Sequence, residues 1–346
     1  MSISSHIDSP LLEALRSGRD ILCVSHVDPD GDAVGSLLGI GWILRRLGKD
    51  PVLALQDAVP VEHRVLPGAS DIITSGSAEY ESAVRWRSFD LVVCVDASSP
   101  DRMGTTYNPE LHGDATLVVI DHHVTNTYFG NLNWVDPDCA ATCQMLVYLA
   151  DALQVPLEGE LAECLLTGLV TDTLGFRTSN TTADVLGAAM RLMEGGAELG
   201  PITQRTVNRR PYSVIKLWGQ VLPRVQLEDG VIWTSVSLDD IAQSGSAEQD
   251  ISLSSFLVTA EEADISAVFT ERQHGDGVPM IDCSFRAKPG FDVSQVAFSL
   301  GGGGHPPASG CTLPGPMQDA IERVVPALKA ARQNSIADDG ADGDHA

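Results

Sequence analysis

Short apolar runs alternate with longer stretches of helical periodicity through the first half of the chain. Strands are expected at Ile21–Val24, Val52–Leu55, Leu91–Val95 and Leu117–Ile120, and helices at Ala33–Leu47, Ala140–Leu153, Leu161–Val170 and Ala183–Met193. The last of these helices is followed by Gly195-Gly196, as expected for a helix C-terminus. The alternation is typical of an α/β fold, and it predicts a doubly wound parallel sheet in a first domain over residues 1–199.

The pattern changes after residue 200. Residues 200–222 are helical and more polar, and we expect them to connect two domains. The residues that follow predict a smaller α/β domain over 223–333, with strands at Arg224–Leu227, Val231–Val236, Ile265–Thr270 and Met280–Ala287 and a helix from Pro316 to about Ala331. The first two strands flank Asp229-Gly230, a pair that favours a hairpin turn. Residues 334–346 are polar and acidic, and we expect a disordered tail there.

Composition and charge limit the number of domains and the class of partner. A chain of 346 residues, of which 43% are hydrophobic, is long enough for two domains with buried cores. It carries 22 Lys and Arg against 47 Asp and Glu, a formal net charge of −25. Such a charge repels a long phosphate backbone, which argues against a protein that tracks duplex nucleic acid. A small anionic substrate is compatible with it only where metal ions or a local cluster of Arg and His reverse the field.

The chain has the composition of an intracellular protein. Its seven cysteines are odd in number and mostly lie in apolar stretches, so we expect them to be reduced. Residues Met1–Asp20 lack the apolar segment of a signal peptide. No run approaches the ~18 apolar residues of a membrane span. The sequence therefore predicts a cytoplasmic protein without a membrane partner.

The first candidate for chemistry is a turn rich in acidic residues, SHVDPDGDAVGS at Ser25–Ser36, which follows the first predicted strand. It places His26, Asp30 and Asp32 at the carboxyl end of a parallel strand, where α/β folds bind their ligands. One imidazole and two carboxylates can hold a divalent cation. Capping of the following helix by the aspartates is the alternative that this segment alone leaves open.

Two further strands end in groups of the same kind. Asp96 directly follows one apolar run, and another ends in Asp121, His122 and His123. The carboxyl ends of parallel strands lie at one edge of a sheet, so we expect these groups to converge on the acidic turn. Asp172 follows a predicted helix, and by itself it is more typical of a helix cap than of a metal ligand.

The number of candidate ligands indicates more than one ion. Six side chains are too many for a single ion and suit two ions that share a carboxylate, and without cations the carboxylates would repel one another by several kcal/mol. Two divalent ions are the usual device for hydrolysing phosphate esters. Mixed His and Asp ligands favour Mn²⁺, with Mg²⁺ or Zn²⁺ as alternatives. The expected ligands are His26, Asp30, Asp32, Asp96, His122 and Asp172.

Candidate substrate contacts lie mainly in the second predicted domain. The run Gly301–Gly304 lets backbone N–H groups turn toward an anion, and the adjoining His305 can donate to a phosphate or stack on a base. Arg286, on a neighbouring predicted strand, can contact a phosphate. A flexible turn and a surface arginine are the alternatives. The candidates are Gly303, Gly304, His305, Arg286 and, in the first domain, Arg102, whose alternative is a solvated loop position.

Taken together, these motifs resemble a known family. SHVDPDGDAVGS, VDASS, DHH at Asp121–His123 and TDT at Thr171–Thr173, in this order, resemble the DHH phosphoesterase superfamily. CSFRAKPGFDVSQVA and GGGGHPPASG are similar to the DHH-associated C-terminal domain. The resemblance implies a parallel-sheet DHH domain followed by a smaller α/β substrate-binding domain. It covers about Asp20 to Ala331 and is most similar to the nanoRNases, the bacterial oligoribonuclease and PAP phosphatase subfamily.

The resemblance also implies a role for each matching position. Asp96 would bridge the two metal ions, and His123 would lie behind the ligands or contact the scissile phosphate, so these two are the expected catalytic residues. The second domain would hold the terminal nucleotide. One ion would be held by His26 and Asp30, and the other by Asp32, His122 and Asp172.

The implied activity is the removal of mononucleotides from very short RNA, with dephosphorylation of 3′-phosphoadenosine 5′-phosphate and hydrolysis of cyclic or linear dinucleotides. The expected partners are thus short RNA oligonucleotides and nucleotide phosphates, since a processive nuclease needs a long basic channel. Two alternatives stay open: a manganese-dependent pyrophosphatase or exopolyphosphatase on the same metal site, and a non-catalytic nucleotide sensor. The sequence also leaves open whether the chain forms a homodimer.

Overall fold

Two compact units make up the chain. The computed structural model describes residues 7–246, 253–273 and 279–342. The units are Met1–Arg209 and Arg210–Ala346, so the division falls inside the segment 200–222 that we expected to be a connector. Helix α7 (Leu199–Arg205) belongs to the first unit and helix α8 (Tyr212–Val221) to the second.

The first unit is built on a parallel sheet, as the sequence pattern predicted. Its strands lie in the order β3-β2-β1-β4-β5-β6, and every neighbouring pair is parallel. Strands β3 and β6 were not predicted, because the first has only two residues and the second is interrupted by the polar Asn133. The strands are β1 (Ile21–Val24), β2 (Val52–Leu55), β3 (Ile73–Thr74), β4 (Leu91–Val95), β5 (Thr116–Asp121) and β6 (Leu132–Val135).

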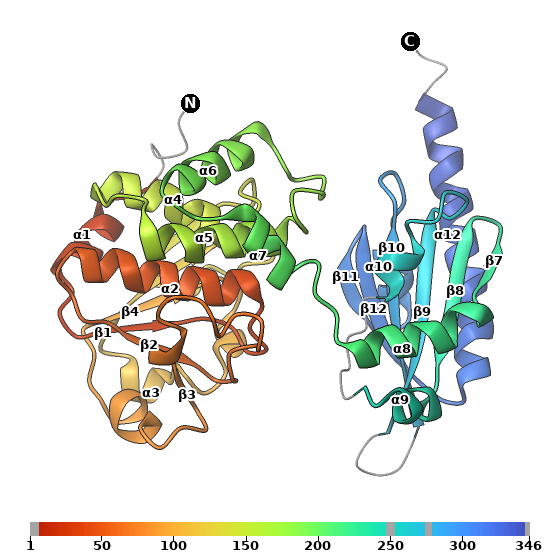
Figure 1. Cartoon of the computed structure of the whole chain (residues 1–346), viewed down its shortest axis with the longest axis horizontal. Coiled ribbons are helices and arrows are strands. Elements are labelled where there is room, and N and C mark those ends of the chain that lie inside the picture. The colour runs from red at the N-terminus through yellow and green to blue at the C-terminus, as the bar shows by residue number, and fades with distance from the viewer. Residues whose placement is uncertain (1–6, 247–252, 274–278, 343–346) are drawn as a thin grey trace. The chain divides into compact units, whose positions relative to one another are not determined.

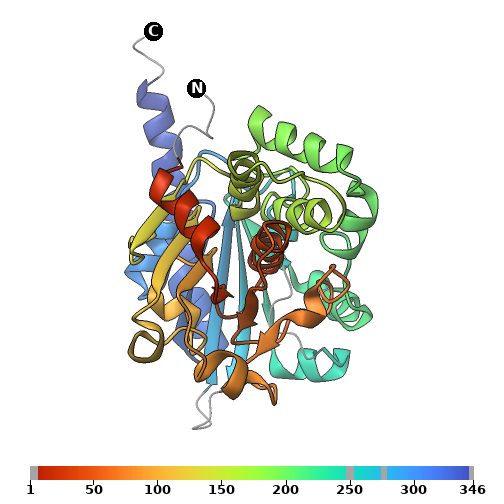
Figure 2. The same cartoon turned by 90° about the vertical axis from the view of Figure 1, so that its left-hand side faces the viewer.

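Helices cover the two faces of this sheet unequally (Figure 1, Figure 2). Helices α2 (Gly31–Arg46) and α4 (Thr142–Leu153) pack on one face, and α5 (Gly159–Asp172) packs on these two helices. The other face is covered by side chains from shorter segments, among them Tyr80, Val84 and Met103. The remaining elements of this unit are α1 (Ser9–Ser17), η2 (Ala69–Asp71), η3 (Glu81–Arg85), η4 (Pro100–Met103), α3 (Pro109–His112) and α6 (Ala183–Glu194).

Glycines let α2 approach α5 and α4 closely. A Cβ atom on Gly35 of α2 would lie 2.7 Å from the carbonyl oxygen of Cys164 in α5 and 3.1 Å from Sγ of Cys143 in α4. On the facing side, a Cβ atom on Gly168 of α5 would lie 2.7 Å from Oδ1 of Asp32. Only residues without a side chain fit at these contacts, so the glycines set the distance between the helices.

A six-stranded sheet also forms the second unit, in the order β11-β12-β10-β9-β8-β7. Strands β8 and β9 are parallel, and the other neighbours are antiparallel. The predicted hairpin is confirmed: Asp229 and Gly230 both have positive φ, 49° and 72°, as its tight turn requires. The strands are β7 (Gln226–Glu228), β8 (Val231–Val236), β9 (Ile265–Gln273), β10 (Pro279–Ala287), β11 (Gly303–His305) and β12 (Ala308–Pro314).

Helices contact both faces of the second sheet. Phe285 belongs to the apolar core on one face, and Ile232 and Val268 belong to the core on the other. Because side chains alternate along a strand, Arg286 lies on the face opposite to that of Phe285. The Phe285 face is covered by α11 (Ser294–Ser299) and α12 (Met317–Asp342), and the other face by α8, α9 (Leu238–Ser244) and α10 (Leu253–Leu257), with η5 (Leu222–Arg224) at the end of α8.

One alternative and one prediction for this unit need correction. The alternative of a flexible turn does not hold for Gly303–His305, which is a short strand paired with β12, because the partner strand supplies the backbone hydrogen bonds. Helix α12 continues past Ala331 to Asp342, where we expected a disordered tail over 334–346. In this extension the Ser335 hydroxyl donates to the Ala331 carbonyl one turn earlier. Residues 343–346 lie outside the described part of the chain. Within that part, no helix is long and apolar enough to cross a membrane.

Gly35→Ala tests the close helix contact. The added methyl group meets backbone in α5, so we expect the free energy of unfolding to fall by about 1–3 kcal/mol. The matched control is Gly187→Ala in α6, where an added Cβ atom meets nothing within 4 Å and should stabilise the helix by about 0.8–1.0 kcal/mol. Urea unfolding followed by far-UV circular dichroism measures both. Equal stability of the two variants would contradict the packing argument.

Candidate metal centre

Three adjacent strands deliver the candidate ligands to one edge of the first sheet. His26 lies just beyond the end of β1, Asp96 follows β4 directly, and His122 follows β5. Asp30 caps the amino end of α2, where its carboxylate accepts the backbone N–H groups of residues 32 and 33. The structure therefore brings the strand-end groups together, as the parallel topology predicted.

The side chains form two neighbouring groups that share Asp96. In the first group, His26 Nε2 lies 3.8 Å from Asp30 Oδ1 and 3.5 Å from Asp96 Oδ2. In the second, His122 Nε2 lies 3.9 Å from an oxygen of Asp32 and 3.3 Å from one of Asp172. Asp96 Oδ1 is 3.7 Å from the same His122 nitrogen, so its two oxygens face different groups.

Asp172 joins this cluster from a different direction. It is the last residue of helix α5, which explains why its position in the sequence resembles a helix cap. The ligand atoms of Asp32, His122 and Asp172 all lie within 4.8 Å of one another, as do those of His26, Asp30 and Asp96. Each group has three donors close enough to share one cation.

Backbone carbonyls fix the orientation of two imidazoles. His26 Nδ1 lies 2.7 Å from the carbonyl oxygen of Val27, and His122 Nδ1 lies 3.3 Å from that of Cys139. A carbonyl oxygen only accepts hydrogen bonds, so each Nδ1 carries a proton that it donates. In the neutral ring Nε2 then keeps the lone pair, and in both residues Nε2 faces the carboxylates. This is the orientation of an imidazole that ligates a cation.

His123 is held differently from the other two histidines. Its Nδ1 lies 2.7 Å from Oδ1 of Asp121, which is fully buried, and Asn126 Nδ2 donates to the other oxygen of that carboxylate at 2.7 Å. Donation to Asp121 occupies Nδ1, although this nitrogen also lies 3.8 Å from Asp96 Oδ1. The structure thus leaves Nε2 of a partly exposed ring as the atom able to exchange a proton. The hydrogen bond to Asp121 is the main factor that raises the pKa of His123.

The electrostatics of the cluster require a compensating charge. Burial, together with the charges of Asp96 and Asp172, raises the pKa of Asp32 well above its usual range, and burial raises that of Asp172 to about 6 although His122 opposes it. Burial lowers the pKa of His122, but the carboxylates, Asp172 above all, raise it to about 10. The carboxylates thus draw protons to the site, and a divalent cation offers the same compensation. The donor set therefore fits divalent metal ions.

Arg102 lies beside the first group, that of His26. A residue of the first unit that contacts the substrate is expected at this place. It belongs to η4, and its carbonyl oxygen accepts the N–H of Val27 at 2.7 Å. Its Nη2 lies 3.1 Å from His26 Nδ1. A guanidinium group carries several N–H donors, so this contact with His26 does not exhaust its capacity to donate to another acceptor.

The other predicted substrate contacts form a row across the second sheet. His305 pairs with Ala308, and Ala308 pairs with Arg286, so the imidazole and the guanidinium group are two strands apart on one face. In the adjacent row on that face, Gly303 pairs with Gly310 and Gly310 with Ser284. Small residues therefore lie beside the row that carries the two polar side chains, and Gly304 lies between Gly303 and His305 in the edge strand.

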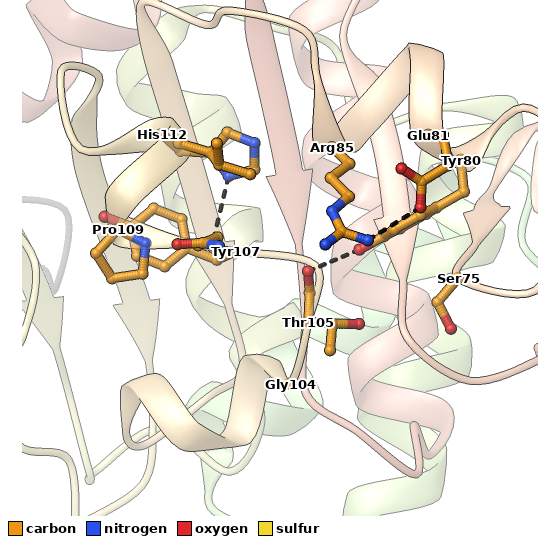
Figure 3. Close-up of a pocket in the computed structure, with 11 residues that line it drawn as sticks. Ser75, Tyr80, Glu81, Arg85, Gly104, Thr105, Tyr107, Pro109 and His112 are labelled. Atoms are coloured by element: carbon orange, nitrogen blue, oxygen red, sulfur yellow. Dashed lines mark hydrogen bonds and ion pairs between the residues drawn. The ribbon is translucent and has the colours of Figure 1, made fainter.

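A cavity of about 410 Å³ in the first unit is separate from this cluster (Figure 3). Its polar side chains are largely paired with one another or with backbone: Arg85 with Glu81, and the Tyr80 hydroxyl with the Thr105 carbonyl. His112 accepts from the Asn108 N–H and donates to a carbonyl of η3. The acidic cluster, and not this cavity, is therefore the candidate site.

Comparison with known proteins agrees with the motifs. Residues 20–169 match the N-terminal domain of the DHH family, and residues 236–334 match the DHHA1 domain. The chain is 36% identical over 311 residues to the bifunctional oligoribonuclease and PAP phosphatase NrnA of Thermus thermophilus, and the match covers 89% of each chain. The chain belongs to the DHH family. The relatives that match most of the chain include enzymes named oligoribonuclease and PAP phosphatase, so the chain is an enzyme, and the resemblance seen in the sequence is confirmed.

Two further relatives bear on fold and chemistry. The chain is 25% identical over 317 residues to the cyclic-di-AMP phosphodiesterase PdeA of Listeria monocytogenes and spans 45% of that longer protein. The crystal structure of an exopolyphosphatase-related protein from Bacteroides fragilis superposes with a TM-score of 0.86 and covers 97% of this chain and 99% of its own. At 22% identity this second likeness shows the fold alone.

Removal and return of metal tests the cluster. We expect Mn²⁺ to raise the melting temperature of metal-stripped protein, because a ligand that binds only the folded state stabilises it, by about 2.7 kcal/mol at a hundredfold excess over Kd. Asp96→Asn should abolish most of this rise without destabilising the stripped protein, since Asn removes one repelling charge and keeps an acceptor. Asp28→Asn, an exposed position in the same turn, is the control. A full Mn²⁺ effect in Asp96→Asn would contradict the shared role of Asp96.

Proposed function

We propose that this enzyme degrades short oligoribonucleotides to mononucleotides and removes the 3′-phosphate of 3′-phosphoadenosine 5′-phosphate. It uses two divalent metal ions for both reactions, and Mn²⁺ is the preferred ion. The observation that carries the proposal is the pair of His and Asp groups with Asp96 facing an imidazole of each. The name of the Thermus relative, an oligoribonuclease and PAP phosphatase, supports the substrate class.

In this proposal each group holds one ion. When bound, two ions lower the pKa of water and stabilise the oxygens of a phosphoryl group under in-line attack. The residues themselves supply fixed donors: the carbonyl partners of His26 and His122 keep both Nε2 atoms directed inward before substrate arrives. The first group is His26, Asp30 and Asp96, and the second is Asp32, His122 and Asp172, with Asp96 between them.

His123 and Arg102 are the residues that would act on the substrate in the first unit. Asp121 holds the His123 ring, so Nε2 can give a proton to the leaving oxygen or contact the phosphate. The exposed guanidinium group of Arg102, next to the first group, can donate to a phosphate oxygen. Both side chains would stabilise charge that develops during hydrolysis.

The second unit would hold the nucleotide. Arg286 and His305 lie on one sheet face, two strands apart and beside a row of small residues. Arg286 would donate to a phosphate, and His305 would donate to a phosphate or stack on a base. With a net charge of −25 on the chain, these local contacts favour short substrates over long RNA. The phosphodiesterase relative extends the proposal to cyclic and linear dinucleotides.

Turnover of three substrates in parallel tests the function. Metal-stripped enzyme with added Mn²⁺ should release mononucleotides from an RNA dimer and phosphate from 3′-phosphoadenosine 5′-phosphate, and should leave a long RNA nearly untouched. Asp96→Asn should reduce turnover by at least a factor of about 1,000, because a group shared by both ions acts on the transition state. Asp28→Asn should retain turnover. Rapid hydrolysis of pyrophosphate with inert nucleotides would overturn the proposal, and binding without turnover would indicate a sensor.

Arg286→Gln tests the role of the second unit. We expect KM for the RNA dimer to rise by about tenfold or more, because a charge-assisted hydrogen bond to phosphate contributes about 1.5–3 kcal/mol. The control is Arg323→Gln, which removes the same charge from an exposed position on α12, the helix on the other face of the sheet. Steady-state kinetics measure both variants. Equal KM values for the two variants would show that Arg286 does not bind the substrate.

A further inference from the structure

One threonine contacts two of the buried carboxylates in the cluster. Thr142 is the first residue of helix α4 and is fully buried. Its backbone N–H donates to Asp32 Oδ2 at 2.6 Å, and its hydroxyl donates to Asp96 Oδ1 at 3.0 Å. The next backbone N–H, that of Cys143, donates to Asp32 Oδ1 at 3.0 Å. Thr142 therefore links a carboxylate of the second group to the carboxylate shared by both.

Asp32 caps helix α4 from another helix. The residue at the capping position of α4, Ala141, has no side-chain oxygen that could accept the first N–H groups. Asp32, which lies in the first turn of α2, accepts two of them instead. A carboxylate at this place is stabilised by the partial positive charge of the helix amino end. The backbone of α4 is thus sufficient to hold Asp32, without any help from the Thr142 side chain.

The hydroxyl group of Thr142 is therefore not needed to hold Asp32 and can donate a hydrogen bond elsewhere. Within a helix, a threonine hydroxyl commonly donates to a carbonyl one turn earlier, as those of Thr167 and Thr171 in α5 do. Thr142 is the first residue of α4, so no helical carbonyl precedes it by one turn. The Thr142 hydroxyl donates to Asp96, which lies 46 residues away in the chain. This contact has no part in helix formation, so its effect falls on the carboxylate.

The contact decides how the Asp96 carboxylate is rotated. Thr142 holds Oδ1, the oxygen that lies 3.7 Å from His122 Nε2 in the second group. With Oδ1 fixed there, Oδ2 is left 3.5 Å from His26 Nε2 in the first group. A rotated carboxylate could not serve both groups. The backbone of Asp96 adds no alternative restraint on this rotation, since its N–H is used by the Ile120 carbonyl.

We propose that Thr142 is a positioning residue for the metal centre: its hydroxyl fixes the rotation of the Asp96 carboxylate that lets one side chain serve both groups. The proposal rests on the proposed function, because it concerns the same site. Residues that orient metal ligands typically change metal affinity by about 10- to 100-fold when they are removed. Thr142 is thus expected to affect metal binding directly, although it is not itself a ligand.

Thr142→Val separates the hydroxyl from the backbone contact, because valine keeps the shape and the N–H that Asp32 accepts. Titration of stripped protein with Mn²⁺, with free Mn²⁺ followed by electron paramagnetic resonance, should show affinity about 10- to 100-fold weaker than in the unchanged protein. At saturating Mn²⁺, kcat for the RNA dimer should fall by a similar factor while KM changes little. Thr142→Ser keeps the hydroxyl and should restore both quantities.

The controls separate this proposal from loss of structure and from failure of the proposed function. Thr234→Val removes an equally buried hydroxyl in the second unit, where the donor contacts the Val221 carbonyl, and should leave Mn²⁺ affinity unchanged. If Thr142→Val does not fold, Thr142→Ala and Thr142→Ser form a second pair that differs in the hydroxyl. If the hydroxyl-free variant binds Mn²⁺ as tightly as the protein without substitutions, the proposed role of Thr142 is wrong. If the protein without substitutions binds Mn²⁺ but does not hydrolyse nucleotides, only the proposed function is wrong.

Discussion

Repulsion among buried carboxylates is the constraint on which the first unit depends. Asp32 and Asp96 are almost completely buried, and Asp172 brings a third carboxylate to the same imidazole, that of His122. Uncompensated charges of this kind are not stable in a protein interior. The compensation comes from several elements at once: imidazoles at two strand ends, the amino end of α4 and, in the proposed function, two divalent ions. The parallel sheet matters because it brings these groups to one place.

The same constraint explains the unusual packing behind the sheet. Asp32 reaches the amino end of α4 only because α2, α4 and α5 approach closely at Gly35 and Gly168. Glycine within a helix costs about 1 kcal/mol relative to alanine, so these positions weaken the helices that contain them. In exchange, the carboxylate lies where N–H groups at the helix amino end donate hydrogen bonds to it. Local helix stability and the arrangement of the site are thus in conflict here, and the arrangement of the site prevails.

The second unit shows which elements the sequence patterns predict and which they miss. The hairpin at Asp229-Gly230 followed from its turn residues, whose backbone conformation is a local property. The strand Gly303–His305 could not be predicted from its residues, since four successive glycines have no strand preference. Pairing with β12 creates this strand. The continuation of α12 to Asp342 was also missed, because a polar and acidic composition predicted disorder where the backbone in fact continues the preceding helix.

The sequence by itself determined the family and the parallel sheet. It also identified the ligand groups that follow strands, because strand ends of a parallel sheet converge whatever the details of packing. Asp172 ends helix α5, and its place among the ligands came from the family resemblance and not from this rule. Tertiary structure decided how the carboxylates and His122 are held. Thr142 and Asp32 are 110 residues apart, and the carbonyl that orients His122 belongs to Cys139 on another segment. The partners of His26 and His123, in contrast, lie within two residues of them in the chain. Periodicity reports which face of an element is buried. It carries no information on which distant N–H or hydroxyl group will meet a given oxygen.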